Sequence, residues 1–172
     1  MKSITAFLML LAVAFGSAAQ SVTEPFTKIE LTSTGKIFLR QGDSTGVVVN
    51  TTGNREKIRT EVKNGVLVIS SKVDAEYNIT MKNIEGISVS GSGEIIGETP
   101  VAADALSLDV SGSGKMTLQL AVKKLNIDIS GVGKETLSGT ADEAKIDISG
   151  SGKVDAYELK VASVRANISG VG

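Results

Sequence analysis

Apolar and polar residues alternate strictly in several short segments in the second half of the chain. Each segment reads apolar, polar, apolar, polar, apolar, and the clearest ones lie at 106–110, 125–129, 144–148 and 164–168. An alternation with a period of two is typical of a strand that is buried on one face. The branched side chains in these segments also favour a pleated surface. We therefore predict one strand in each segment.

A four-residue motif, Ser-Gly-x-Gly, follows each of these segments and one earlier segment. It begins at Ser90, Ser111, Ser130, Ser149 and Ser169, at intervals of 19 to 21 residues. Helical repeats are longer, and leucine-rich repeats of similar length carry a Leu/Asn consensus that is missing here. A unit of about 20 residues with one clear strand and one glycine corner indicates one rung of a β-solenoid. We therefore predict an all-β β-solenoid over residues 83–172.

Stacked rungs would bury their apolar side chains in continuous columns. The predicted columns are Ile87, Leu108, Ile127, Ile146 and Ala166, and Val89, Val110, Ile129, Ile148 and Ile168. Each corner would need glycine because glycine tolerates φ > 0 and lets two backbones approach closely. The predicted structural corners are Gly91, Gly93, Gly112, Gly114, Gly131, Gly133, Gly150, Gly152, Gly170 and Gly172. A phosphate-binding loop is the alternative, but it requires a following helix and a Gly-Lys-Ser/Thr ending, and neither is present.

Residues 20–82 carry strand patterns without the tight repeat. The candidate strands are 26–31, 36–41, 47–51, 58–63 and 66–71. Asn64-Gly65 separates the last two and predicts a hairpin, because a type I′ turn needs φ > 0 at both central positions. No proline or linker divides this part from the repeats. We therefore expect one continuous sheet system in residues 20–172, in which the N-terminal strands cap or begin the solenoid.

The first nineteen residues predict a secretory signal peptide. Lys2 precedes an apolar run at 4–15, and small residues at 16–19 allow cleavage before Gln20. The run is shorter than the roughly 20 residues of a membrane-spanning helix. We therefore expect no transmembrane segment in the mature chain and a location in the periplasm, at the cell surface or outside the cell. The absence of cysteine excludes a disulfide framework.

The amino-acid composition excludes several classes of catalytic and binding site in the mature chain. The protein has no histidine, which excludes Ser-His-Asp and Cys-His catalysis and the usual zinc sites. Without Lys2 the charged residues are 17 basic and 19 acidic, which does not suit a nucleic-acid-binding surface. Aromatic residues are few and scattered, and tryptophan is absent. We expect no catalytic residues and no cofactor.

Two charged ladders follow from the repeat. Asp109, Asp128 and Asp147 occupy equivalent positions and form a weak candidate Ca²⁺ site, because Ca²⁺ prefers clustered oxygen ligands. The alternative is a solvated polar face, since like charges about 5 Å apart in water repel by only about 1 kcal/mol. Lys115, Lys134 and Lys153 form a second ladder just past the corners, with Glu94 at the equivalent earlier position.

The chain also resembles a known family in residues 26–31, 37–43 and 57–69 and in its serial Ser-Gly-x-Gly corners. This family is the putative auto-transporter adhesin, head GIN domain, found mainly in secreted or envelope proteins of Gram-negative bacteria. The resemblance covers essentially all of the mature chain. It implies a right-handed β-helix, which agrees with the general chirality of β connections, an adhesive role and no established catalytic residues. Family members usually continue with further rungs, so it also implies a fragment or a short variant.

Three functional hypotheses remain open from the sequence. The first is a non-enzymatic surface or periplasmic interaction module, adhesin-like, with an unknown surface protein or glycan as partner. The second is a β-helix enzyme that acts on envelope polysaccharide, against which the scarcity of aromatic residues argues. The third is a structural or assembly protein, because an unpaired edge at the C-terminal end of the sheet is a template for another strand and would allow self-association.

Overall fold

The computed structural model describes residues 24–171. The expected signal peptide at 1–19 and the corner residue Gly172 lie outside the described residues. Across residues 24–171, no helix has the length and apolar character that crossing a membrane would require.

The N-terminal part contains six strands and one short helical turn. The strands are β1 (Lys28–Leu31), β2 (Gly35–Gln41), β3 (Gly46–Asn50), β4 (Ile58–Lys63), β5 (Val66–Ser71) and β6 (Glu76–Met81), and the 3₁₀ turn η1 spans Arg55–Lys57. The five strands predicted before residue 72 are confirmed within two residues at each end. Asn64 and Gly65 have φ values of 52° and 76°, and β4 and β5 pair antiparallel across them, which confirms the predicted hairpin.

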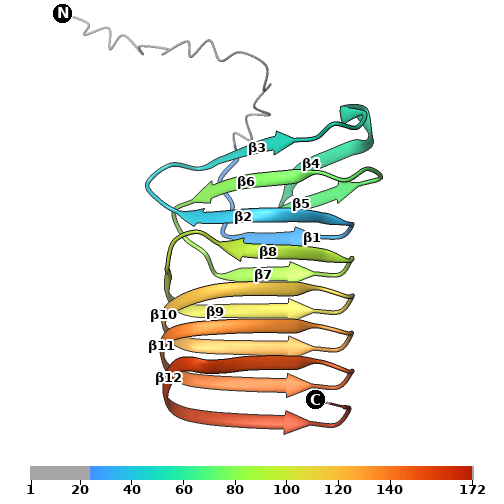
Figure 1. Cartoon of the computed structure of the whole chain (residues 1–172). Coiled ribbons are helices and arrows are strands. Elements are labelled where there is room, and N and C mark those ends of the chain that lie inside the picture. Colours follow the sequence, from blue (N-terminus) through green and yellow to red (C-terminus); the bar gives the residue numbers. More distant parts are fainter. Residues whose placement is uncertain (1–23, 172) are drawn as a thin grey trace, which may run out of the picture.

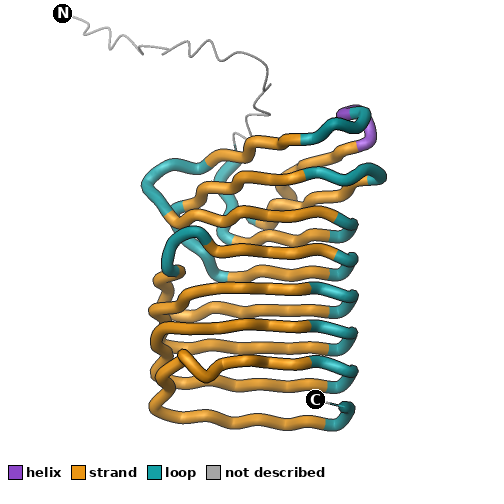
Figure 2. The backbone as a smooth tube through the Cα atoms, in the orientation of Figure 1, coloured by secondary structure: helices purple, strands orange, loops and turns teal. Residues whose placement is uncertain are grey.

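The second part consists of strands that lengthen toward the C-terminus. They are β7 (Gly86–Val89), β8 (Gly93–Gly97), β9 (Val101–Val110), β10 (Lys115–Ile129), β11 (Lys134–Ile148) and β12 (Lys153–Ile168). The first four Ser-Gly-x-Gly corners each separate two successive strands, and the fifth follows β12. From β10 onward a single strand runs from one corner to the next (Figures 1 and 2).

The strands form one open, curled sheet of mixed orientation, so the predicted right-handed β-solenoid with one rung per repeat is wrong. The sheet has 12 strands, in the order β3-β6-β2-β8-β10-β9-β7-β1-β5-β4, with β11 on β10 and β12 on β11. Two pairs, β3 with β6 and β4 with β5, are antiparallel. The chain order is also broken, because β1 lies between β5 and β7, and β2 between β6 and β8. The N-terminal strands are thus members of the sheet and not a cap on a separate coil.

Continuous strands explain why the repeat builds a curled sheet. β10 and β11 each hold 15 residues and β12 holds 16, which is well above the usual strand length of roughly 5 or 6 residues. Strands of this length bend and twist along the sheet instead of breaking into separate short faces. The repeat therefore supplies long neighbouring strands, and on β10 and β11 both halves of the strand contribute to one apolar core.

The register of the predicted columns is confirmed, although their last members, Ala166 and Ile168 on β12, are exposed and not buried. Ile127 pairs in register with Leu108 on one side and with Ile146 on the other. Ile87 and Ala166 extend this column at its two ends. The second column is in register in the same way from Val89 to Ile168. Parallel pairing at an offset of one repeat therefore sets which side chains enter the core.

Close packing, and not positive φ, accounts for the glycines at the corners. Among the described glycines, φ is positive at Gly35, Gly65 and Gly139, none of which lies in a corner. A Cβ atom on Gly131 would lie 2.1 Å from the carbonyl oxygen of Gly112. That oxygen already accepts a hydrogen bond of 2.9 Å from the backbone N–H of Val132. At the first glycine of each corner, backbone therefore stacks on backbone at a separation that leaves no room for a side chain. A Cβ atom on the second glycine would instead meet core side chains, such as Ile129 next to Gly152.

The last strand has one unpaired edge in the described structure. β12 pairs with β11 alone, and its apolar residues Val164 and Ile168 are 58% and 55% exposed. Self-association through this edge stays a prediction.

Candidate binding groove

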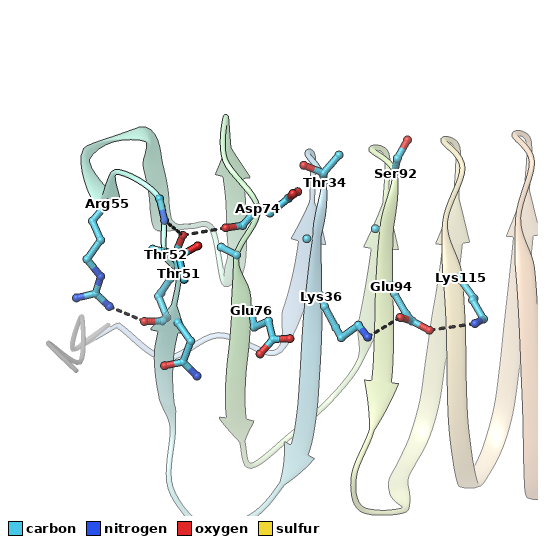
Figure 3. Close-up of a pocket in the computed structure, with 16 residues that line it drawn as sticks. Thr34, Lys36, Thr51, Thr52, Arg55, Asp74, Glu76, Ser92, Glu94 and Lys115 are labelled. Carbon is cyan, nitrogen blue, oxygen red and sulfur yellow. Dashed lines mark hydrogen bonds and ion pairs between the residues drawn. The ribbon is translucent and has the colours of Figure 1, made fainter. Parts of the chain in front are cut away.

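A polar groove crosses one face of the sheet where the N-terminal strands meet the repeats. It has a volume of about 1100 Å³ and is bordered by β2, β3, β6, β8 and the start of β10, together with the loops around residues 34, 52 and 92. Figure 3 shows the labelled side chains of this groove. Most of the side chains that line it are hydroxyl, amide or charged groups, Val49 and Ala75 line it as well, and no aromatic side chain does.

Strand register places the charged groups of the groove in a line. Glu76 pairs in register with Lys36, Lys36 with Glu94, and Glu94 with Lys115. Each of these residues is followed by a buried one, Tyr77, Ile37, Ile95 and Met116. Because successive side chains on a strand point to opposite faces, the buried residues fix the charged ones on the outer face. We call the line Glu76, Lys36, Glu94, Lys115 the charged row.

Glu94 joins two cations in the middle of the charged row. Its carboxylate accepts from Lys36 Nζ at 3.1 Å and from Lys115 Nζ at 3.1 Å, as Figure 3 shows. These hydrogen bonds, that of Lys36 first, hold the pKa of Glu94 below its usual range. The carboxylate is therefore ionised at neutral pH and bridges β2 to β10 on the surface.

The far wall of the groove is a loop fixed by its own hydrogen bonds. Thr51 Oγ1 donates to the carbonyl oxygen of Asp74 at 2.8 Å and accepts from the N–H of Gly53 at 3.0 Å. The guanidinium of Arg55 donates to the carbonyl oxygen of Val49. Asn54 caps η1 by accepting from the N–H of Glu56 at 2.9 Å. These contacts hold Thr51 and the loop that follows it in place at the groove.

In the described structure the predicted aspartate ladder is in register, but its carboxylates are not grouped as metal ligands are. Asp109, Asp128 and Asp147 are partners on β9, β10 and β11. Asp147 is engaged by Lys145 at 2.5 Å and by the side-chain amide of Asn167 at 2.8 Å, and these hydrogen bonds lower its pKa. Within residues 24–171, no three acidic side chains lie where they could hold a metal ion together.

Two features of the structure escaped the sequence analysis. The groove was missed because Thr51, Thr52 and Asp74 belong to segments that do not repeat. The second feature is Glu135, whose carboxyl group is fully buried on β11, with both oxygens lacking a hydrogen-bond partner. A signal for Glu135 does exist, because Met116 and Val154 occupy the equivalent positions in the neighbouring repeats.

Comparisons with known proteins place this arrangement among adhesin-like folds. A putative adhesin from Bacteroides fragilis is similar with a TM-score of 0.82 and 26% identity, over 91% of this chain and 78% of that one. A putative adhesin from Parabacteroides merdae has a TM-score of 0.66 at 19% identity, over 89% of this chain and 77% of its own. A putative lipid binding protein from Parabacteroides distasonis has a TM-score of 0.64 at 16% identity, over 90% and 79%. The last two likenesses show the fold alone.

No curated protein matches the chain. The family model described as putative auto-transporter adhesin, head GIN domain, matches residues 25–172, so the chain belongs to this family, as the sequence resemblance predicted.

Proposed function

We propose that the protein is a non-enzymatic adhesin module, exported with residues 1–19 removed, that binds a surface partner through the groove. Residues 20–172 act as one domain in this proposal. Membership of an adhesin family and the similarity to the Bacteroides fragilis adhesin support an interaction role. The same comparisons favour this role over that of an enzyme acting on polysaccharide.

One observation carries the proposal, namely a large groove that is polar and already shaped. Binding sites are concave and are usually formed before the ligand arrives. The groove holds about 1100 Å³, and its walls are fixed by the Glu94 ion pairs on one side and by the Thr51 and Arg55 hydrogen bonds on the other. A ligand would therefore meet groups that need little reordering, which lowers the entropic cost of binding.

A substitution at the groove mouth tests this proposal. Ser92 lines the groove and is the third residue of its corner. The equivalent residue of a later corner is Val132, which is 63% exposed, so a larger side chain fits at this position without disturbing the fold. We expect Ser92→Trp to block the groove and to weaken binding to the ligands that the wild-type protein captures on a glycan array by about tenfold, or about 1.4 kcal/mol.

Ser44→Trp is the matched control. Ser44 is exposed in the loop between β2 and β3 and does not line the groove. We expect this variant to bind as the wild type does. Equal binding by both variants, or no capture of any array ligand by the wild type, would contradict the groove as the binding site.

A further inference from the structure

The charged row continues beyond the groove as a line of lysines. Lys115 pairs in register with Lys134, and Lys134 with Lys153. Adjacent strands lie roughly 4.8 Å apart, so cations recur at that interval across β10, β11 and β12. We call Lys115, Lys134 and Lys153 the lysine row. It leaves the groove at Lys115, which belongs to both.

The outer two lysines of the row carry charge that the protein does not neutralise. Lys134 and Lys153 are exposed, and across residues 24–171 neither takes part in an ion pair. Glu135, next to Lys134, is buried on the opposite face of the strand. The next outward positions on β10 and β11 are the neutral Thr117 and Thr136, and the equivalent position on β12 holds an acid, Asp155.

The side chains around the groove and the lysine row distinguish between classes of ligand. A protein partner would need apolar or aromatic anchors at the centre of the interface. In the described part of the chain, the exposed large apolar side chains are Val48, Val132, Tyr157, Val164, Ile168 and Val171, and none of them lines the groove. A neutral glycan would be held chiefly by aromatic rings stacked on its sugars, and the groove lining has none. The groove lining holds as many acids as bases, Asp74, Glu76 and Glu94 with Lys36, Arg55 and Lys115. The unpaired charges of Lys134 and Lys153 therefore suit the anionic groups of a ligand, and the hydroxyls of the groove suit its hydroxyl groups.

We propose that the groove and the lysine row together bind a linear anionic polysaccharide, which lies across the strands. This inference rests on the proposed function and names the class of its ligand. A pyranose unit in a linear chain is about as long as the spacing between strands, roughly 4.8 Å. Successive carboxylate-bearing sugars therefore meet successive lysines, while the hydroxyls of Thr34, Thr51 and Ser92 meet the sugar hydroxyls in the groove.

Titration with polygalacturonate, a linear polymer of a uronic acid, tests the proposal. The variant is Lys134→Gln combined with Lys153→Gln, which removes the two unpaired charges without changing the core. We expect it to weaken the affinity measured by calorimetry by about tenfold. We also expect the wild-type affinity to fall as salt is raised, because salt screens exposed charges. The matched control is Lys82→Gln combined with Lys124→Gln, two exposed lysines outside the row, which should bind as the wild type does.

Two further polymers separate the possible outcomes. Dextran, a neutral glucan, and poly-L-glutamate, a polyanion without sugar, should both bind much more weakly than polygalacturonate. Equal affinity for poly-L-glutamate, or equal losses in the two lysine variants, would overturn the polysaccharide assignment. Failure to bind polygalacturonate, with groove-dependent capture of another glycan intact, would overturn this inference and leave the proposed function standing. If the protein neither binds polygalacturonate nor captures any other glycan through the groove, the proposed function itself is contradicted.

Discussion

Replacing Gly131 with valine is expected to lower the free energy of unfolding by about 3 kcal/mol or more. The new Cβ would lie 2.1 Å from the carbonyl oxygen of Gly112 and 2.6 Å from that of Ser111. Both contacts are with backbone, which cannot move aside without breaking the hydrogen bond from the N–H of Val132 to Gly112. Urea unfolding of the wild type and the variant measures the loss.

Gly46→Val is the matched control for this substitution. Gly46 lies at the start of β3, and a Cβ atom there would have no neighbour within 4 Å. We expect its effect to stay within about 1 kcal/mol, as is usual for an open site. Equal destabilisation by the two valines would show that close stacking of the corners is not the reason for their glycines.

Replacing Glu135 with methionine is expected to stabilise the protein by about 3 kcal/mol at neutral pH. The carboxyl group of Glu135 is fully buried, and neither oxygen has a hydrogen-bond partner. Burial, with a further contribution from the negative charge of Asp109, raises the pKa of Glu135 to about 8. Methionine copies Met116, the register partner of Glu135 on β10, so the new side chain suits the same part of the core.

Glu135 should make the wild-type protein less stable as pH rises from about 4.5 to about 8. The carboxyl group of Glu135 is protonated in the folded protein near pH 7, whereas in the unfolded chain it ionises above its ordinary pKa of 4.5. Ionisation therefore favours unfolding as pH rises from 4.5, and this effect levels off near pH 8, where the folded form ionises too. We expect the gap in stability between Glu135→Met and the wild type to widen over this range.

Glu135→Gln separates ionisation from burial of a polar group. Glutamine removes the titration but keeps an unsatisfied amide in the core, so we expect a stability that is lower than that of Glu135→Met and shows less pH dependence than the wild type. Urea unfolding at about pH 5 and about pH 8 measures all three proteins. A stability gap between wild type and Glu135→Met that is the same at both pH values would contradict a buried, protonated carboxyl group.

The register of the repeats could be predicted from the sequence because one physical rule determines it. Apolar residues recur once per repeat, and a slip of one residue would turn every side chain to the other face. Ile127 and Ile146 therefore had to be neighbours. The fold class could not be predicted in this way, because the repeat does not determine where the non-repeating strands join the sheet. The insertion of β1 and β2 between other strands follows from tertiary packing that residues 26–41 do not reveal.

The candidate site was less accessible to sequence reasoning than the core. Groove residues such as Thr51 and Asp74 come from loops, where no periodic pattern identifies them. Lys134 was found because it repeats, yet Glu135 beside it was missed because Lys-Glu-Thr has the appearance of a polar, exposed strand start. Aligning the repeats places Glu135 between Met116 and Val154, and this comparison shows an inward position. Positive φ was the wrong reason for the corner glycines, since close approach alone accounts for them.

Parallel, in-register pairing of successive repeats underlies both the core columns and the lysine row, and a disulfide tests it most directly. The protein has no native cysteine, so Lys134→Cys with Lys153→Cys introduces a single pair on adjacent strands. In-register partners roughly 4.8 Å apart fall within the range that a disulfide can bridge. We predict rapid intramolecular oxidation of this pair and little oxidation of Lys134→Cys with Asp155→Cys, which is displaced by two residues. Preferential oxidation of the displaced pair would contradict the register and, with it, the lysine row.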